Sequence, residues 1–347
     1  MGDRPHLAET RPTLSVVVPV CDEEATLLEL HRRTVAVLEG LGESFELVFV
    51  DDGSRDGSLA VLRRLADADR RVKVIALSRN FGHLMSITAG LDYARGDAVL
   101  VMDGDLQDPP EVIPDLVAQW RLGFDVVHAV RRARDGETAF KRGAARAFYR
   151  LLQRLSPLDV PLDTGDFRLL SRRAADELRR IREQSRYLRG LASWVGFRQT
   201  GVAYAREQRW AGDTKFGLGR MLRFGLDGIT SFSFVPLQLA TYLGLAMAIG
   251  CLALLGWVVF ERLAGVGAVP GWTSIIVVVL FVAALQFLIL GLHGEYIGRI
   301  YAEVKRRPLY VVAEMHNLAG RSAPEVAHPA VTVAGAAGAR RERRAGD

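Results

Sequence analysis

The first two hundred residues alternate between short apolar runs and segments whose apolar positions have helical spacing. Runs rich in β-branched residues predict strands, and the amphipathic segments between them predict helices. The predicted strands are 13–20, 45–50, 72–77, 98–102 and 125–130, and the predicted helices are 24–41, 57–68, 84–94 and 110–120. This alternation, with nearly all-apolar strands, predicts a parallel sheet covered by helices on both faces. The predicted fold class is therefore α/β, with a Rossmann-like sheet.

Two long apolar runs follow in the last third of the chain. Residues 234–260 and 272–292 carry no charge, and each is long enough for the roughly 20 residues with which a helix crosses a bilayer. A short, glycine-containing connection joins them, so the pair predicts a transmembrane helical hairpin. A buried helical pair in a soluble domain is the alternative, and it is disfavoured because core helices seldom run this long without a charge.

Basic residues flank the hairpin on both outer sides. Lys215, Arg220 and Arg223 precede the first run and a basic cluster at 305–307 follows the second, whereas the connection carries Arg262 alone. The positive-inside rule then places both termini in the cytoplasm, and the predicted location is the inner membrane with two passes. The polar start of the chain lacks the apolar core of a signal peptide, which agrees with this orientation.

The resulting division of the chain has eight parts. They are a polar tail at 1–12, a cytoplasmic α/β domain at 13–212, a juxtamembrane amphipathic helix at 213–232, a first transmembrane helix at 233–260, an extracytoplasmic loop at 261–271, a second transmembrane helix at 272–296, a cytoplasmic segment at 297–318 and a disordered basic tail at 319–347. Residues 309–315 predict a strand, which we expect to pair with the sheet edge of a neighbouring subunit.

Composition narrows the possible classes of protein. The chain has 347 residues, 49% of them hydrophobic, and a formal net charge of +5, which excludes a disordered or collagen-like chain. Cys21 and Cys251 are its two cysteines, so a disulfide framework or a cysteine-rich zinc site is excluded.

The most polar sequence of the α/β domain lies in the loops after the predicted strands, where ligands bind in such sheets. The first loop reads Pro19-Val20-Cys21-Asp22-Glu23-Glu24 instead of Gly-x-Gly-x-x-Gly, which disfavours a dehydrogenase. The second, Asp51-Asp52-Gly53-Ser54, offers acceptors for base N–H groups and ribose hydroxyls. The fourth, Asp103-Gly104-Asp105-Leu106-Gln107-Asp108, places alternate carboxylates where one magnesium or manganese ion can bind both and neutralise a diphosphate.

Taken together, these motifs resemble the inverting family 2 glycosyltransferases, and within them the polyprenyl-phosphate glycosyltransferases akin to bactoprenol glucosyltransferases and dolichyl-phosphate mannose synthases. The resemblance runs from about residue 13 to 318 and includes the hairpin. It also rests on two further motifs, Ser78-Arg79-Asn80-Phe81-Gly82-His83 and Thr164-Gly165-Asp166-Phe167-Arg168. It implies a GT-A fold and the transfer of one sugar from a nucleotide sugar to undecaprenyl phosphate at the cytoplasmic face, for cell-envelope glycosylation. We expect glucose from UDP-glucose, although these motifs do not separate uridine from guanosine donors or glucose from mannose, galactose, N-acetylhexosamine or an aminoarabinose.

The resemblance also implies roles for individual residues. The residues that it implies for binding the nucleotide sugar are Pro19, Asp22, Glu23, Asp51, Asp52, Ser54 and Asp103. The residues that it implies for binding the metal ion are Asp103, Asp105 and Gln107. The catalytic group comprises Asp166, Asp105 and Arg131, and the acceptor and diphosphate group comprises Arg131, Arg146, Arg206, Arg209 and Lys215. Arginine suits this task because its planar fork binds phosphate oxygens in pairs. For His83 we expect a simple helix cap.

Two alternative functions remain for this sequence. A processive polysaccharide synthase would need more membrane helices and a Gln-x-x-Arg-Trp motif, but this chain has Arg206 at the glutamine position of that motif. A membrane-tethered scaffold would bind nucleotide sugar without turnover. The expected partners are the donor, the polyprenyl phosphate, membrane lipid and further copies of the chain, as a homo-oligomer and possibly a tetramer; no nucleic acid is expected.

Overall fold

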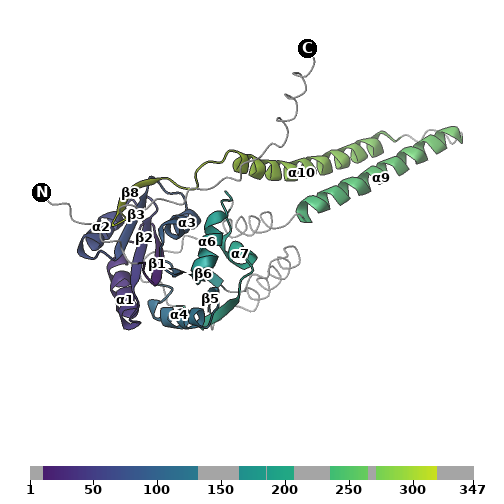
Figure 1. Cartoon of the computed structure of the whole chain (residues 1–347). Coiled ribbons are helices and arrows are strands. Elements are labelled where there is room, and N and C mark those ends of the chain that lie inside the picture. Colours follow the sequence, from purple (N-terminus) through teal and green to yellow (C-terminus); the bar gives the residue numbers. More distant parts are fainter. Residues whose placement is uncertain (1–10, 132–163, 185, 207–234, 265–270, 319–347) are drawn as a thin grey trace, which may run out of the picture.

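The computed structural model describes residues 11–131, 164–184, 186–206, 235–264 and 271–318. One sheet, flanked by helices, forms the body of the molecule, and two long helices project from it (Figure 1). The strands are β1 (Leu14–Val20), β2 (Phe45–Asp51), β3 (Val72–Leu77), β4 (Ala98–Val101), β5 (Val126–Arg131), β6 (Thr164–Ser171), β7 (Gln199–Tyr204) and β8 (Val312–His316). The helices are α1 (Leu27–Gly40), α2 (Ser58–Ala68), α3 (His83–Tyr93), a 3₁₀ turn at Pro110–Val112, α4 (Ile113–Arg121), α6 (Arg172–Arg180), α7 (Leu188–Trp194), α9 (Val235–Leu263) and α10 (Trp272–Val304).

The sheet has eight strands in the order β7-β5-β6-β4-β1-β2-β3-β8. Strands β1 to β4 are mutually parallel where they pair, as predicted from the alternation of strands and helices. However, β6 runs antiparallel to both β4 and β5, and β8 runs antiparallel to β3. The predicted parallel arrangement holds for β1 to β4, and the antiparallel strands β6 and β8 make the whole a mixed sheet of GT-A-like fold. Periodicity within one strand carries no information on the direction of its neighbour.

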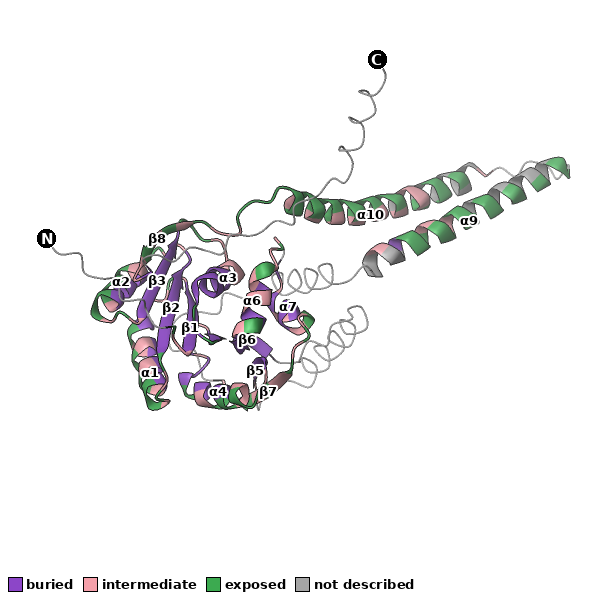
Figure 2. Cartoon of the chain, in the orientation of Figure 1, coloured by how far each residue is buried: buried purple, intermediate pink, exposed green. Residues whose placement is uncertain are grey.

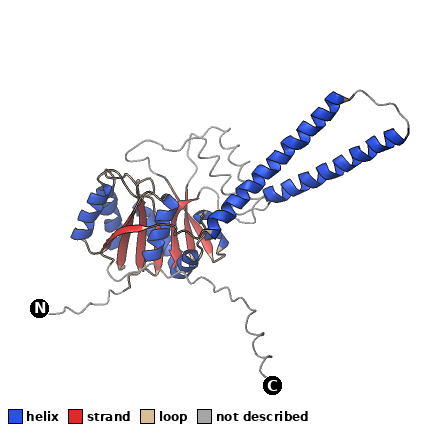
Figure 3. Cartoon of the chain, turned by 90° about the horizontal axis from the view of Figure 1, so that it is seen from above, coloured by secondary structure: helices blue, strands red, loops and turns tan. Residues whose placement is uncertain are grey.

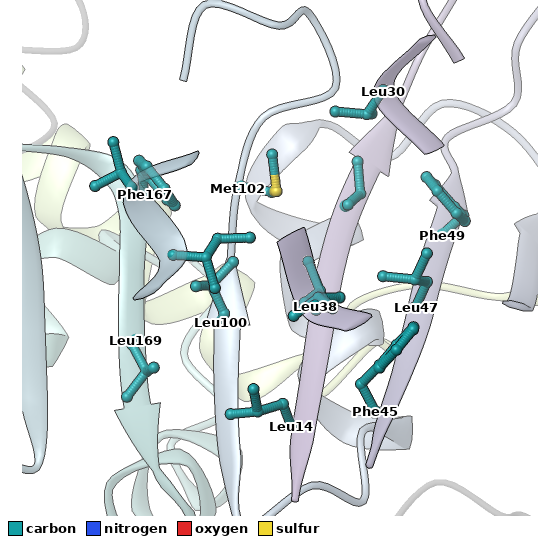
Figure 4. Packing of buried hydrophobic residues seen from close by; sticks show 14 of the residues in the cluster. Leu14, Leu30, Leu38, Phe45, Leu47, Phe49, Leu100, Met102, Phe167 and Leu169 are labelled. Atoms are coloured by element: carbon teal, nitrogen blue, oxygen red, sulfur yellow. The ribbon is translucent and has the colours of Figure 1, made fainter. Parts of the chain in front are cut away.

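Alternating side chains of the central strands feed two hydrophobic clusters, one on each face of the sheet. Val16 and Val18 of β1 belong to the cluster under α1, α2 and α4, whereas Val17 belongs to the cluster under α3, α6 and α7. Figure 4 shows part of the first cluster, where Leu38 of α1 is seen between Leu100 of β4 and Leu47 of β2. Because both faces are covered there, the strands β1 to β4 and β6 are buried throughout, as Figure 2 shows, whereas the edge strands β7 and β8 are partly exposed.

Strand β8 closes the sheet at the β3 edge of its own chain. Ile75 lies opposite Met315 in the antiparallel pairing, and Arg63 of α2 forms an ion pair with Glu314 at 2.5 Å. The Asn317 side chain donates hydrogen bonds to two backbone carbonyls of the same domain. The predicted pairing of this strand with another subunit is therefore wrong in this structure, because the open edge of β3 lies within reach of the same chain.

The two long helices pack against each other and extend away from the sheet (Figures 1 and 3). Large apolar side chains along both are exposed, among them Leu252, Trp257, Phe281 and Phe287. Within the described part of the chain, one helical segment, Phe281–Val304, has the length and apolar composition of a membrane-crossing helix.

The end of α10 is fastened to the α/β domain by polar contacts. Glu303 accepts a hydrogen bond of 2.6 Å from the Gln184 backbone amide. The Tyr310 hydroxyl donates to Asp92 at 2.6 Å, and Arg182 donates two further bonds to the same buried carboxylate. The hairpin therefore leaves the domain from a defined position.

The close packing of the turn before β4 can be tested by substitution. Gly96 donates a hydrogen bond to Ser15, and a Cβ at Gly96 would lie 2.7 Å from the Ala98 carbonyl oxygen. Because the obstructing atoms are backbone, we expect Gly96→Ala to reduce the free energy of unfolding by about 2 kcal/mol, measured by denaturant unfolding. Gly40→Ala is the control, since no atom lies within 4 Å of the added methyl group. Equal stability of the two variants would contradict the described packing.

Candidate active site

Strand register brings two acidic residues together at one end of the sheet. Val101 of β4 lies opposite Val17 of β1 and, on the other side, opposite Arg168 of β6. Because β4 and β6 are antiparallel, continuing both chains two residues beyond this pair brings Asp103 and Asp166 to the same end of the sheet. The strand order also reverses at β1, and α/β sheets bind ligands in the crevice outside such a point.

Asp166 is buried and held by two arginines. Arg189 of α7 donates hydrogen bonds to both carboxylate oxygens of Asp166, at 3.1 and 3.2 Å. Arg168 lies beneath, 3.4 Å from Oδ1, and its guanidinium also donates to the carbonyls of Gly165 and Leu188. Burial would raise the pKa of Asp166, but the charge of Arg189 and the hydrogen bonds hold that pKa well below its usual value. Asp166 is therefore an anion at neutral pH.

His83 connects the two acidic residues. Its Nε2 lies 3.4 Å from Asp103 Oδ1 and 3.3 Å from Asp166 Oδ2. Burial would lower its pKa, but the hydrogen bond with Asp166 and the two negative charges raise that pKa above the usual histidine value. The prediction that His83 caps α3 is wrong, because Gly82 occupies the N-cap and no side chain caps this helix.

Asp103 has the chemistry expected of a cation ligand. Burial raises its pKa to about 6, opposed by His83 and assisted by the like charges of Asp108, Asp166 and Asp105. Its buried Oδ1 accepts no hydrogen bond. Carboxylate oxygens packed this closely, with one not hydrogen-bonded, fit a hard divalent cation such as Mg²⁺ or Mn²⁺. Among the described residues, no three His, Cys, Asp or Glu side chains form a ready ligand set, so other donors would have to complete the coordination.

The other members of the acidic loop have local contacts. Asp105 Oδ1 accepts a hydrogen bond from the Gln107 backbone amide at 3.1 Å. Leu106 has a left-handed backbone conformation with a φ of 59° and is buried, which turns the loop sharply between these two residues. A Cβ at Gly104 would lie 3.1 Å from the carbonyl oxygen of Pro19, so the loop passes close to the end of β1.

The loops after β1 and β2 are joined to each other. The Asp22 carboxylate accepts a hydrogen bond from the Arg55 amide at 2.7 Å, and the Ser54 hydroxyl accepts one from the Asp22 amide at 3.1 Å. Glu23 donates its amide to the Ser58 hydroxyl. Asp51 is buried, and its Oδ1 accepts no hydrogen bond. These residues form one connected wall beside Asp103.

Both carboxylate oxygens of Asp52, unlike Oδ1 of Asp51, accept hydrogen bonds. Its two oxygens accept hydrogen bonds from the amides of Phe81 and Gly82, at 2.7 and 2.9 Å. It therefore holds the start of α3 against β2, which fixes the position of His83. The predicted contact of Asp52 with the nucleotide stays a prediction.

Part of the predicted acceptor group lies beside Asp108. Arg131, at the end of β5, donates from Nε to the Tyr204 hydroxyl at 3.3 Å, and this hydroxyl donates to Asp108. Arg206 Nε lies 3.8 Å from the same Asp108 oxygen. Of the other predicted acceptor residues, Arg146, Arg209 and Lys215 lie outside the described residues.

Three side chains of this site were not predicted from the sequence. His83 lies in the motif Ser78-Arg79-Asn80-Phe81-Gly82-His83, but the sequence does not show that its side chain lies beside Asp103 and Asp166. Arg189 and Tyr204 belong to α7 and β7 and have no local pattern that marks them. Only the fold brings them to the acidic loops.

A mixed GT-A-like sheet with acidic loops at its topological switch point is the arrangement expected of a glycosyltransferase. The sequence profile of Glycosyl transferase family 2 matches residues 15–179. The uncharacterized glycosyltransferase YkcC of Bacillus subtilis is 48% identical over 304 residues, covering 88% of this chain and 94% of that protein. The chain belongs to glycosyl transferase family 2.

Other relatives have more specific names. The prophage bactoprenol glucosyl transferase homolog of Escherichia coli K12 is 39% identical over 300 residues, covering 86% of this chain and 98% of that protein. The bactoprenol glucosyl transferase of Shigella phage SfII is 39% identical over 304 residues, covering 88% and 98%. Among solved structures, mannosyl-3-phosphoglycerate synthase from Rubrobacter xylanophilus has a TM-score of 0.45 and 19% identity, covering 63% of this chain and 72% of that one.

The Asp166 ion pair predicts a pH-dependent stability. Because Asp166→Asn removes the counter-charge of two arginines, we expect a loss of about 3 kcal/mol in the free energy of unfolding at pH 7. A carboxyl group with a lowered pKa stabilises the fold above its unfolded pKa and loses this effect as the pH falls through its folded pKa. Asp166 also raises the pKa of His83, so the difference from wild type should grow as the pH falls from 8 to 5 and His83 becomes protonated, and should narrow only below about pH 4, where Asp166 itself is protonated.

Denaturant unfolding across this pH range checks the prediction. Asp176→Asn is the control, because Asp176 is 43% exposed and pairs with Arg172 and Arg179 at the surface. Its effect should stay below about 1 kcal/mol. A difference for Asp166→Asn that does not narrow below about pH 4 would show that the group is not held as an anion.

Proposed function

We propose that the protein transfers one glucose from UDP-glucose to undecaprenyl phosphate at the cytoplasmic face of the membrane, with inversion at the anomeric carbon. The observation that carries the proposal is the joining of Asp103 and Asp166 through His83 at the sheet end. The relatives named bactoprenol glucosyl transferase, aligned over most of this chain, support the choice of sugar and lipid. The product would be a polyprenyl-phosphate sugar for cell-envelope glycosylation.

The donor nucleotide would bind against the wall formed by the first two loops. Asp51 offers a buried carboxylate oxygen that accepts no hydrogen bond, suited to a base N–H or a ribose hydroxyl. Pro19, Asp22, Glu23, Asp52 and Ser54 would complete this wall, with Asp103 at its end. The hydrogen bonds between the loops keep this wall in place before the donor binds.

Asp103, Asp105 and Gln107 would hold one Mg²⁺ or Mn²⁺ ion. When bound, the ion would neutralise charge on the diphosphate leaving group. The loop's own contribution is to keep these oxygen donors at the carboxyl end of β4, directly beside the donor wall.

The acceptor needs orientation more than deprotonation. A phosphate monoester already carries negative charge at neutral pH, so a strong general base is unnecessary. The harder task is to bring two anions together, and Arg131 and Arg206 would reduce their repulsion, joined by Arg146, Arg209 and Lys215. Asp166, with its low pKa, would orient a sugar hydroxyl instead of taking a proton. In-line attack by the phosphate oxygen on the anomeric carbon then expels the nucleoside diphosphate.

The hairpin of α9 and α10 would hold the active site close to the lipid surface. We propose that α9 and α10 both cross the inner membrane, with the α/β domain and both termini in the cytoplasm; the predicted amphipathic helix at 213–232 lies outside the described residues. The exposed apolar side chains of the two helices and the basic residues after α10 support this placement. Assembly as a homo-oligomer, possibly a tetramer, belongs to the same proposal.

A transfer assay tests the proposal directly. Detergent-solubilised protein is incubated with undecaprenyl phosphate, Mg²⁺ or Mn²⁺ and a panel of labelled nucleotide sugars, and label extracted into organic solvent is counted. We expect transfer from UDP-glucose and a loss of at least about 100-fold in Asp105→Asn. Asp115→Asn, an exposed aspartate on α4, is the matched control and should retain wild-type turnover.

The alternative outcomes separate the rival functions. Tight nucleotide-sugar binding with no transfer to any tested lipid would indicate a scaffold. Label in a long polymer would indicate a processive synthase. Full activity of Asp105→Asn would overturn the metal assignment while leaving the glycosyl transfer intact.

Arg131 provides a separate prediction for the acceptor. Because its guanidinium would contact the lipid phosphate and not the donor, Arg131→Ala should raise the KM for undecaprenyl phosphate by about tenfold or more and leave the KM for UDP-glucose within about twofold. Initial rates measured against each substrate at saturating levels of the other give both values. An equal rise in both constants would show that Arg131 does not belong to the acceptor.

A further inference from the structure

Four polar side chains gather on the side of the acidic loop that faces away from the donor wall. Asp108, the last aspartate of that loop, is fully buried. The Tyr204 hydroxyl donates a hydrogen bond to Asp108 Oδ1 and accepts one from Arg131 Nε at 3.3 Å. Arg206 Nε lies 3.8 Å from the same carboxylate oxygen. We call these four residues the Asp108 cluster.

The sheet determines where the cluster stands. Strands β5 and β7 are parallel, and their register places Arg131 directly opposite Tyr204. The Tyr204 ring packs edge-on against Phe167, with 5.7 Å between ring centroids and an angle of 89°. Phe167 is fully buried and directly follows Asp166. Packing therefore fixes the tyrosine ring, and with it the position of the hydroxyl group.

A glycine makes room for the arginine. A Cβ built on Gly165 would lie 2.6 Å from Nη2 of Arg131 and 3.2 Å from Cζ, so the guanidinium rests against the backbone of β6. Gly165 directly precedes Asp166. The guanidinium is thus held from two independent directions, by the Tyr204 hydroxyl and by the bare backbone at Gly165, next to Asp166.

Such restraint matters for an arginine that binds phosphate. A guanidinium is a planar fork, and it binds two phosphate oxygens only when its plane is correctly oriented. The hydrogen bond from Nε to Tyr204 fixes this plane, because rotation of the fork would break it. An arginine oriented in advance loses less conformational entropy on binding than an unrestrained one. Asp108 in turn orients the hydroxyl, since a hydroxyl that donates to a carboxylate presents its lone pairs elsewhere.

We propose that Tyr204 and Asp108 are positioning residues for the acceptor phosphate, which they serve by orienting Arg131 over Gly165 beside Asp166. The inference rests on the proposed function and deepens it, since it identifies how the acceptor subsite is built. It assigns the last aspartate of the acidic loop to the acceptor side, whereas Asp103 and Asp105 serve the donor side. One loop then links the two substrates.

The first test removes one oxygen atom. Tyr204→Phe keeps the ring against Phe167 but removes the hydrogen bonds to Asp108 and Arg131. We expect the KM for undecaprenyl phosphate to rise about tenfold, with the KM for UDP-glucose within about twofold of wild type. Tyr310→Phe is the matched control, because it removes a tyrosine hydroxyl from a buried aspartate, Asp92, away from the site. It should reproduce any loss of melting temperature without the change in KM.

A double-mutant cycle then asks whether Tyr204 acts through Arg131. If it does, Tyr204→Phe should raise the acceptor KM about tenfold in the wild-type background and less than about twofold in the Arg131→Ala background. A merely structural role of the hydroxyl would give the same factor in both backgrounds. Equal factors would therefore overturn the proposal even if both single variants are impaired.

A second variant disturbs the same arginine without removing any hydrogen-bonding group. Gly165→Ala would displace the Arg131 guanidinium and should raise the acceptor KM as Tyr204→Phe does. Gly201→Ala is its control, because the added methyl group would meet the apolar side chain of Val130 at 2.8 Å instead. This pair keeps the proposal testable if Tyr204→Phe does not fold.

The outcomes distinguish this inference from the function on which it rests. If the wild-type protein transfers no sugar to the lipid, the proposed function fails. If Arg131→Ala raises the acceptor KM but Tyr204→Phe and Gly165→Ala do not, the proposed function stands and the positioning role is overturned. A rise in the donor KM alone in these two variants would place the Asp108 cluster on the donor side and would also overturn it.

Discussion

The charge of Asp166 is the constraint on which the site depends. A carboxylate in the interior is costly unless it is paired and hydrogen-bonded, and here Arg189 and Arg168 do both. Arg168 is itself buried, with its remaining hydrogen bonds directed to backbone carbonyls at Gly165 and Leu188. Because these carbonyls belong to β6 and α7, the ion pair also fixes these two elements relative to each other. A single anion thus organises the contact between β6 and α7.

In the loops after β1, β2 and β3, backbone amides hold the carboxylates in place, as the two arginines hold Asp166. Asp52 receives two of them from the β3–α3 loop, and Asp22 receives one from the β2–α2 loop. Each carboxylate replaces the hydrogen bonds that a loop cannot make within a helix or a strand. The loops after β1, β2 and β3 are therefore joined by acidic side chains, whereas arginines gather beside Asp166 and Asp108. Under the proposed function, this division would give the two anionic substrates different surroundings at the same end of the sheet.

The elements that the sequence predicts well are those set by local pattern. Strands from Leu14–Val20 to Val126–Arg131 and the helices between them follow from apolar periodicity, and the acidic loops follow as the segments that end the strands. The antiparallel direction of β6 does not, since its side-chain alternation is the same in either direction. The pairing of Asp166 with Arg189 and that of Tyr204 with Asp108 were missed for the same reason. Contacts between distant segments depend on register, which a single sequence leaves open.

The last strand has a consequence for the order in which the protein is made. β8 pairs with β3, yet it follows both long helices in the chain, and its Glu314 meets Arg63 across 251 positions. During synthesis, β3 must therefore stand as an open edge until the whole hairpin has left the ribosome. Open edges invite pairing with other chains. The α/β domain thus completes its sheet only after both long helices have been made, so a chain that stops before residue 312 retains the acidic loops but leaves this edge of the sheet unpaired.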